Sequence, residues 1–199
     1  MPDGSDNTGD LAKAKDELTK CGQPNGFTLK MAYVPGGKAD KVLAATQAAL
    51  KRVGITVTPL AGEQASYYST FIGSPQNVIN KGMGMAIAAW APDFPTLNGE
   101  YQNIVTTGAI KPSGTSNYAS LSDPKIDQAV NQAGQTTDSG KLEELGKTVN
   151  HAVMDGAVYL PFLWDASYYY RNPRLTNVYL SPGTSFYYDY VNIGTTDGK

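Results

Sequence analysis

Residues 83–96, with the sequence MGMAIAAWAPDFPT, decide how we interpret the fold of this chain. Their first seven residues are small or apolar and carry no charge, which is typical of a strand covered on both faces in an α/β sheet. Pro92 and Pro95 then prevent further strand pairing. Trp90 and Asp93 are therefore predicted on a stiff turn at the carboxyl end of a central strand, where ligand sites of open α/β sheets gather. A core tryptophan beside a turn-forming aspartate is the alternative interpretation.

The composition indicates a folded protein of modest charge. Of its 199 residues 41% are hydrophobic and 17% charged, and the net charge is −2, which suits one compact domain. No basic cluster is available to neutralise a phosphate backbone, so we expect no nucleic-acid partner. No apolar run reaches the ~20 residues of a membrane span, and no signal peptide is visible. Cys21 is the single cysteine, which excludes an internal disulfide, and we expect it to fill a buried helix face.

The residues before this stretch predict a βαβ unit. Residues 27–33 alternate as a half-buried strand, residues 40–53 carry an amphipathic helical pattern, and residues 55–58 form a second strand that Pro59 ends. Because the connections are short, the two strands are expected to be parallel and the crossover right-handed. Helices are also predicted over residues 10–21 and, from a weaker pattern, over residues 64–72.

A long segment without periodic pattern follows, over residues 97–121. Loops of this length inside a compact domain are usually functional or disordered. Its aromatic and amide side chains are candidates to line a pocket, and surface exposure is the alternative. These side chains are Tyr101, Asn103, Asn117 and Tyr118.

The last third of the chain predicts two helices, a strand and a tail of different character. Asp123 followed by Pro124 is a strong helix start, and a second helix is predicted over residues 138–155. Residues 157–164 form an apolar strand that Pro161 places at an edge or a bulge. The tyrosine-rich residues 167–199 are expected in short extended pieces that lie across a second body.

The chain offers little chemistry for catalysis. His151, the single histidine, lies on the solvent face of its predicted helix, and the signatures of nucleophilic hydrolases and of phosphate-binding loops are absent. Asp93, Glu100 and Asp165 leave a glycosidase-like carboxylate pair as an alternative. Aromatic rings with one aimed carboxylate favour binding. We therefore predict a protein that is not an enzyme, with no catalytic residues, metal or cofactor.

Six short motifs follow one another along the chain. They are DLAKAKDELTKCG with Gly26-Phe27-Thr28-Leu29, TQAALKRVGITVTP, Tyr67, Trp90-Ala91-Pro92-Asp93, SNYASLSDPKIDQAV and Leu160-Pro161. In this order they resemble the carboxyl-terminal part of the peptide-binding class of extracytoplasmic solute-binding proteins (solute-binding protein family 5). These proteins are the receptors of ABC importers.

The resemblance implies one lobe of a two-lobed, type II clamshell of the periplasmic-binding-protein kind, with a mixed sheet flanked by helices. Residues 1–166 would form the ligand-binding lobe, and residues 167–199 would return to an amino-terminal lobe that this sequence lacks. The implied function is to capture a small solute, expected to be a short peptide, and to deliver it to a membrane permease. The implied location is periplasmic or on the cell surface as a lipoprotein, with the signal and anchor outside this sequence.

The resemblance also implies which residues contact the solute. Asp93 would pair with the α-ammonium group of a peptide and Trp90 would line the pocket, and the resemblance extends to these two residues only. Phe94, Asn117 and Tyr118 complete the predicted set from the residues themselves. The motif departs from the family where Phe94-Pro95-Thr96 replaces a frequent Asp-Pro, and no arginine stands near it. Sugars, metal chelates and other small solutes therefore stay open as ligands. A carbohydrate-binding module is a further alternative, although four capped helices argue against an all-β fold.

Overall fold

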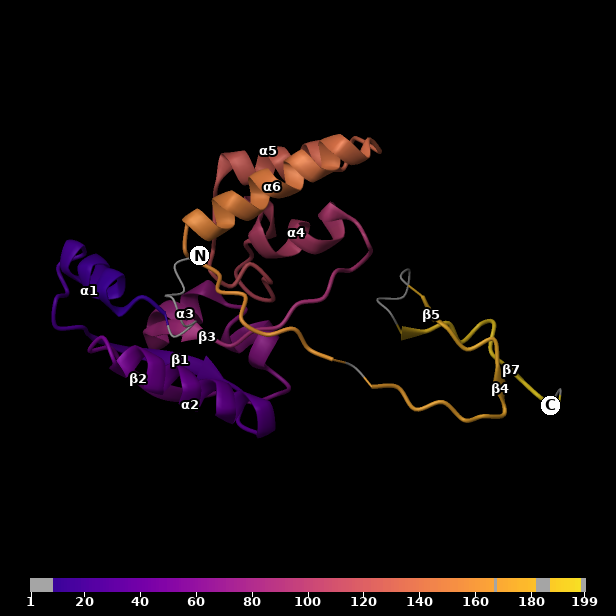
Figure 1. Ribbon diagram of the computed structural model, residues 1–199, viewed down its shortest axis with the longest axis horizontal. Coiled ribbons are helices and arrows are strands. Elements are labelled where there is room, and N and C mark those ends of the chain that lie inside the picture. The colour runs from indigo at the N-terminus through magenta and orange to yellow at the C-terminus, as the bar shows by residue number, and fades with distance from the viewer. Residues whose placement is uncertain (1–8, 167, 182–186, 198–199) are drawn as a thin grey trace. The chain divides into compact units, whose positions relative to one another are not determined.

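The computed structural model describes residues 9–166, 168–181 and 187–197. The chain divides into two compact units, residues 1–89 with 112–114 and residues 90–111 with 115–199. Both units contain helices and strands (Figure 1), so the predicted α/β class is confirmed. Among the described helices, none has the length and apolar character that crossing a membrane requires.

A three-stranded parallel sheet organises the first unit. Its strands are β1 (Thr28–Tyr33), β2 (Thr56–Ala61) and β3 (Met83–Ala86), in the order β2-β1-β3. Both β2 and β3 pair with β1 in the parallel sense, and α2 (Gly37–Lys51) connects β1 to β2. The predicted βαβ unit and its parallel strands are therefore confirmed.

The prediction of a central strand over residues 83–89 is wrong. In the described sheet β3 lies at the edge, and its regular structure ends at Ala86. Met83 and Met85 are half-buried, whereas Gly84 and Ala86 are exposed, so the strand alternates. The central strand is β1, where Ala32 is completely buried. A run of small apolar residues does not distinguish these places, because such residues tolerate both burial and exposure.

Strand β2 continues through Pro59, contrary to the prediction that this proline ends it. Pro59 lies opposite Met31 in the ladder. The strand is tolerant of proline because in the described sheet it has a neighbour on one side only, so the missing N–H interrupts no second ladder.

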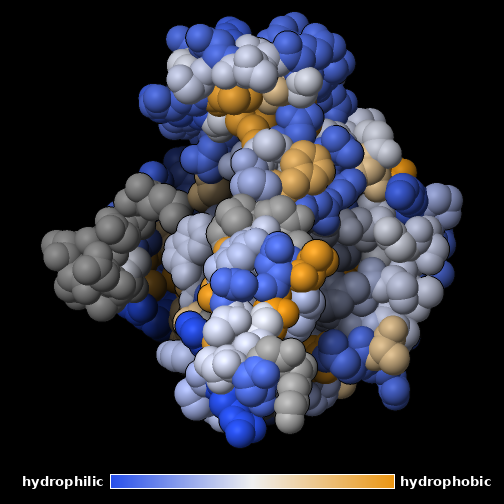
Figure 2. All heavy atoms as spheres, turned by 90° about the vertical axis from the view of Figure 1, so that its right-hand side faces the viewer, coloured by the Kyte–Doolittle hydropathy of each residue, from blue (hydrophilic) through white to orange (hydrophobic). Residues whose placement is uncertain are grey.

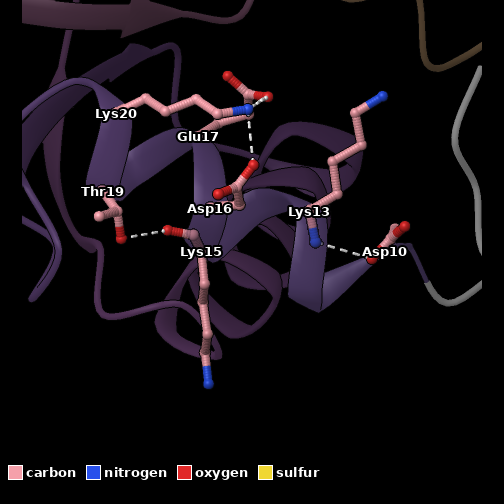
Figure 3. Close-up of polar contacts among 7 residues, drawn as sticks. All are labelled: Asp10, Lys13, Lys15, Asp16, Glu17, Thr19 and Lys20. Carbon is pink, nitrogen blue, oxygen red and sulfur yellow. Dashed lines mark hydrogen bonds and ion pairs between the residues drawn. The ribbon is translucent and has the colours of Figure 1, made fainter.

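Helix α1 (Leu11–Lys20) begins as predicted, with the Asp10 side chain accepting a hydrogen bond from the Lys13 backbone N–H at 2.9 Å. Figure 3 shows its polar face, where the Lys20 ammonium pairs with Asp16 at 2.6 Å and with Glu17 at 3.1 Å. These side chains are exposed, so the pairs add little stability. They keep this face of α1 hydrophilic.

Two predictions for the first unit need correction. Cys21 is exposed rather than buried, because it caps the end of α1, where its Sγ contacts the Leu18 carbonyl at 3.2 Å. The helix predicted over residues 64–72 is a short π-helix, η1 (Tyr67–Phe71), followed by an unpredicted α3 (Pro75–Lys81). A hydrophobic core cluster of the unit contains Leu18, Met31, Leu43, Val53, Ile55 and Val57.

Helices form the body of the second unit. Helix α5 (Pro124–Ala133) and helix α6 (Ser139–Asp155) lie side by side, with α4 (Leu97–Val105) packed against α5 (Figure 1). Asp123 and Asp138 cap the starts of α5 and α6, as the sequence predicts. His151 is exposed, also as predicted. Their shared core contains Val105, Ile126, Ala129, Val130, Ala133, Leu145, Val149 and Val153.

The segment predicted to lack regular structure, residues 97–121, contains α4 and a 3-10 turn, η2 (Thr107–Ala109). The apolar residues Leu97, Tyr101 and Ile104 follow helical spacing and pack against the core of the unit. The adjacent Asn98 and Gly99 form a dipeptide typical of turns, so the local sequence does not favour a helix at this point.

Residues 157–164 are not a strand, which corrects the prediction. They have no ladder partner among the described residues. Their apolar side chains, other than the half-buried Tyr159, are exposed, from Val158 at 39% to Trp164 at 97%. Figure 2 shows apolar side chains at the surface of one face of the molecule, in small patches between hydrophilic ones. A strand needs a neighbour to bond with, and the described residues provide none for this segment.

Two short antiparallel ladders order the tail. Strand β4 (Leu175–Thr176) pairs with β7 (Gly194–Thr195), and β5 (Leu180–Ser181) pairs with β6 (Tyr187–Tyr188). Between the ladders, Asp189 accepts hydrogen bonds from the Tyr179 hydroxyl at 2.7 Å and from the Asn192 amide at 2.9 Å. The predicted extended pieces are partly confirmed; residues 167 and 182–186 lie outside the described residues.

Candidate functional site

The loop that carries Trp90, Asp93 and Phe94 is fastened to the first turns of α4. The Asp93 backbone N–H donates to the Gly99 carbonyl at 3.1 Å, and the Asn103 side-chain amide donates to the Asp93 carboxylate at 2.7 Å. Asn103 follows Gly99 by one helical turn, so both contacts come from the same face of α4. The Asp93 carboxylate therefore has a fixed direction while remaining exposed to solvent.

Gly99 allows this close approach of loop and helix. A Cβ atom at this position would lie 2.1 Å from the Phe94 carbonyl oxygen, far inside contact distance. The Gly99 N–H in turn donates to the Thr96 hydroxyl, which caps the start of α4, at 3.1 Å. A side chain at this position would push the Asp93 loop away from α4.

The two aromatic residues of the loop differ in exposure. Phe94 is 44% exposed, whereas Trp90 is half-buried. The indole Nε1–H of Trp90 is buried, and among the described residues it has no acceptor. Buried tryptophan N–H groups usually find a partner, so this donor is an exception among the buried polar groups of the described residues.

The buried Asn117 side chain forms a junction, in which it connects the backbone at Thr106 to the backbone at Leu121. Its side-chain amide donates to the carbonyls of Thr106 at 3.0 Å and Leu121 at 2.8 Å. Its side-chain oxygen accepts from the Leu121 N–H at 2.9 Å, and the side chain is completely buried. Both amide hydrogens are therefore used within the protein, and the residue fixes the loop that carries the half-buried Tyr118.

Tyr159 joins this junction from the segment that follows α6. Its hydroxyl donates to the Ile104 carbonyl at 2.8 Å and lies 3.4 Å from the Asn117 side-chain oxygen. Burial raises the pKa of the Tyr159 hydroxyl to about 12, so it remains a hydrogen-bond donor at neutral pH. The two predicted loops are thus connected through α4, with Asp93 bound near its start and Asn117 at its end.

The pKa shift of Tyr159 predicts a stability change at alkaline pH. In the folded protein the pKa of Tyr159 is raised above its ordinary value of 10.0 to about 12. The contribution of its protonated hydroxyl to the free energy of unfolding is therefore complete below pH 10 and is lost as the pH rises to 12. Replacement by phenylalanine removes the titrating group. We expect the melting temperature of the wild type to fall more steeply than that of Tyr159→Phe above pH 10. Parallel curves in calorimetric scans would contradict this expectation.

Helix α4 presents two further features near the loop. Partial burial raises the pKa of the Glu100 carboxyl, and burial with the neighbouring Glu100 charge raises the pKa of Tyr101. A shallow depression of about 390 Å³ is lined by residues of α4 and α5 and contains none of the predicted site residues. Its polar lining is largely used for helix contacts, such as the bond from Asn98 to the Val130 carbonyl. Within the described residues, no group of three or more potential metal ligands occurs.

Sequence reasoning missed Gly99 and Tyr159 as parts of this arrangement. The spacing of Leu97, Tyr101 and Ile104 was the available signal for α4, and it would have placed Gly99 in a helix. No local signal identifies Tyr159, because its partner Ile104 is 55 residues away in the sequence.

Relatives with known names cover most of this chain. No family model matches it. The glutathione-binding protein GsiB of Pectobacterium atrosepticum is 25% identical over 181 residues, which are 90% of this chain and 35% of the relative. The solved structure of clavulanic acid biosynthesis oligopeptide binding protein 2 is 35% identical and covers 98% of this chain and 35% of its own, with a TM-score of 0.90. The predicted resemblance to peptide-binding receptors is confirmed.

A third comparison supports the fold of the lobe. The periplasmic binding protein DppA from Helicobacter pylori, solved in complex with the peptide STSA, is 24% identical, with a TM-score of 0.65. It covers 76% of this chain and 28% of its own. The α/β arrangement is therefore that of a lobe of the peptide-binding receptors. The chain spans about a third of the length of the curated relatives it matches.

Proposed function

We propose that this chain is the solute-binding lobe of an extracytoplasmic receptor that delivers a short peptide to the permease of an ABC importer. The observation that carries the proposal is the exposed Asp93 carboxylate, which accepts a hydrogen bond from the Asn103 amide while the Asp93 backbone N–H donates to the Gly99 carbonyl of α4. A fixed carboxylate suits an ammonium group, because a charge-assisted hydrogen bond is strong and directional. The relatives are named as binding proteins for glutathione and for oligopeptides. Both kinds of solute carry a free α-ammonium group.

The remaining predicted residues divide into solute contacts and supports. Trp90 offers a half-buried indole ring, and Phe94 offers an exposed ring, so we assign both to the solute together with the half-buried Tyr118. Asn117 has both amide hydrogens engaged inside the protein, so we assign it to supporting the site. The relatives are binding proteins, and we expect no catalysis from these residues.

We also propose that residues 1–166 form the lobe and that residues 167–199 lie across a second lobe. The exposed apolar run that leads into this tail supports the proposal. Leu160, Phe162, Leu163 and Trp164 are 53% to 97% exposed, and runs of this kind usually mark a contact surface. We propose that the protein acts outside the cytoplasmic membrane. More specifically, we propose that a lipid anchor holds the complete receptor at the cell surface.

Titration of the 199-residue chain with trialanine, followed by nuclear magnetic resonance, tests the proposed function. Solute sites enclose most of the ligand surface, so one lobe supplies part of the contacts. A micromolar site has a binding free energy of ~8 kcal/mol. Half of it, about 4 kcal/mol, corresponds to a millimolar dissociation constant. We expect saturable shifts at Trp90 and Asp93 with such a constant, and weaker ones for the N-acetylated peptide. Equal shifts for both peptides, or no saturation, would contradict the proposal.

A further inference from the structure

Helix α4 ends in contacts from two distant segments of the chain. The last carbonyls of a helix lack partners within the helix. Here the Tyr159 hydroxyl donates to the Ile104 carbonyl, and the Asn117 amide donates to the carbonyl of Thr106, the residue that follows the helix. Side chains from segments 11 and 55 residues away thus complete the end of α4.

The same helix holds the predicted solute carboxylate. Asn103, which donates to Asp93, immediately precedes Ile104, which accepts from Tyr159. On the other side of the junction, Asn117 immediately precedes Tyr118 in the chain. A shift of the Tyr159 ring would therefore be transmitted to both loops, to one through α4 and to the other through the Asn117 side chain.

We infer that Tyr159 is a positioning residue, which fixes the Asp93 loop and the Tyr118 loop relative to each other. The inference rests on the proposed function only in calling these loops a solute site. Tyr159 belongs to the segment that leads from α6 toward the tail. Its hydrogen bond to the Ile104 carbonyl therefore attaches this segment to the end of α4. The raised pKa of its hydroxyl agrees with a donor that stays protonated.

Amide hydrogen exchange in the 199-residue chain tests this inference without any solute. Two amides report on the two loops: that of Leu121, bonded to the Asn117 side chain, and that of Asp93, bonded to the Gly99 carbonyl. Tyr159→Phe removes one hydrogen bond, and local opening is governed by the free energy of such contacts. We expect both amides to exchange about fivefold faster.

Asp138→Ala is the matched control. It removes the cap of α6 in the same unit, at a similar expected cost in stability, and the Asp138 carboxylate bonds only to the Lys141 N–H among the described contacts. In this variant the free energy of opening at Leu121 and Asp93 should change by no more than the free energy of global unfolding does. Asn117→Ala serves as a second variant and should accelerate exchange at Leu121 further. If Tyr159→Phe and Asp138→Ala give the same exchange at Asp93, the inference is overturned.

Discussion

Gly99→Ala is expected to destabilise the protein and to detach the Asp93 loop from α4. Alanine is normally better than glycine inside a helix by about 1 kcal/mol. Here its methyl group would lie 2.1 Å from the Phe94 carbonyl oxygen, and backbone atoms cannot yield as a flexible side chain can. The cost of such overpacking is about 1–3 kcal/mol, so we expect a net loss of stability in urea unfolding.

Gly140→Ala provides the control for this prediction. Gly140 lies in the first turn of α6, as Gly99 does in α4, and a Cβ atom there would meet the Asp138 carboxylate at an ordinary 3.5 Å. The helix preference for alanine should then act alone and stabilise the protein by about 0.5–1 kcal/mol. Equal effects of the two substitutions would show that the loop does not press on α4.

Local signals were sufficient to predict most helices. Helices α5 and α6 begin where Asp123 and Asp138 offer capping carboxylates, and their buried stripes follow the period of the sequence. A cap and a stripe involve neighbours within a few residues, so no knowledge of tertiary structure is needed.

The wrong predictions of secondary structure concern segments whose conformation depends on residues far away in the sequence. Pro59 is accommodated because its strand lies at an edge, and residues 83–86 alternate because β1 occupies the centre. The turn-like Asn98 and Gly99 belong to a helix whose start receives the Asp93 loop.

The sequence predicts the proposed solute contacts of the candidate site but not the residues that support them. Phe94 stands where the motif departs from the family, whereas Trp90 and Asp93 follow from the prolines and from the family motif. The role of Asn117 does not, because an amide in a polar loop gives no indication that it will be buried among the carbonyls of two other residues. Burial and satisfied hydrogen bonds distinguish a supporting amide from one that contacts a solute, and neither is visible in the sequence.

Asp93→Asn is expected to weaken peptide binding strongly with little effect on stability. The amide is close in size to the carboxylate, and its oxygen can still accept from Asn103, so the loop should keep its place. What is lost is the charge opposite the peptide ammonium group, worth about 1.5–3 kcal/mol. Calorimetry on a two-lobed receptor that contains this lobe measures the change. Asp40→Asn, at an exposed carboxylate in α2, is the control and should leave affinity unaltered.

A cycle with N-acetylated trialanine identifies the partner of Asp93. Acetylation removes the ammonium charge from the peptide, as the asparagine variant removes the carboxylate charge from the protein. If the two groups pair directly, each change alone weakens binding, and the second change costs little once the first has been made. The expected coupling free energy is therefore most of the binding free energy that either change alone removes. Two fully additive losses would separate Asp93 from the ammonium group and leave it as a residue that only shapes the turn between Pro92 and Pro95.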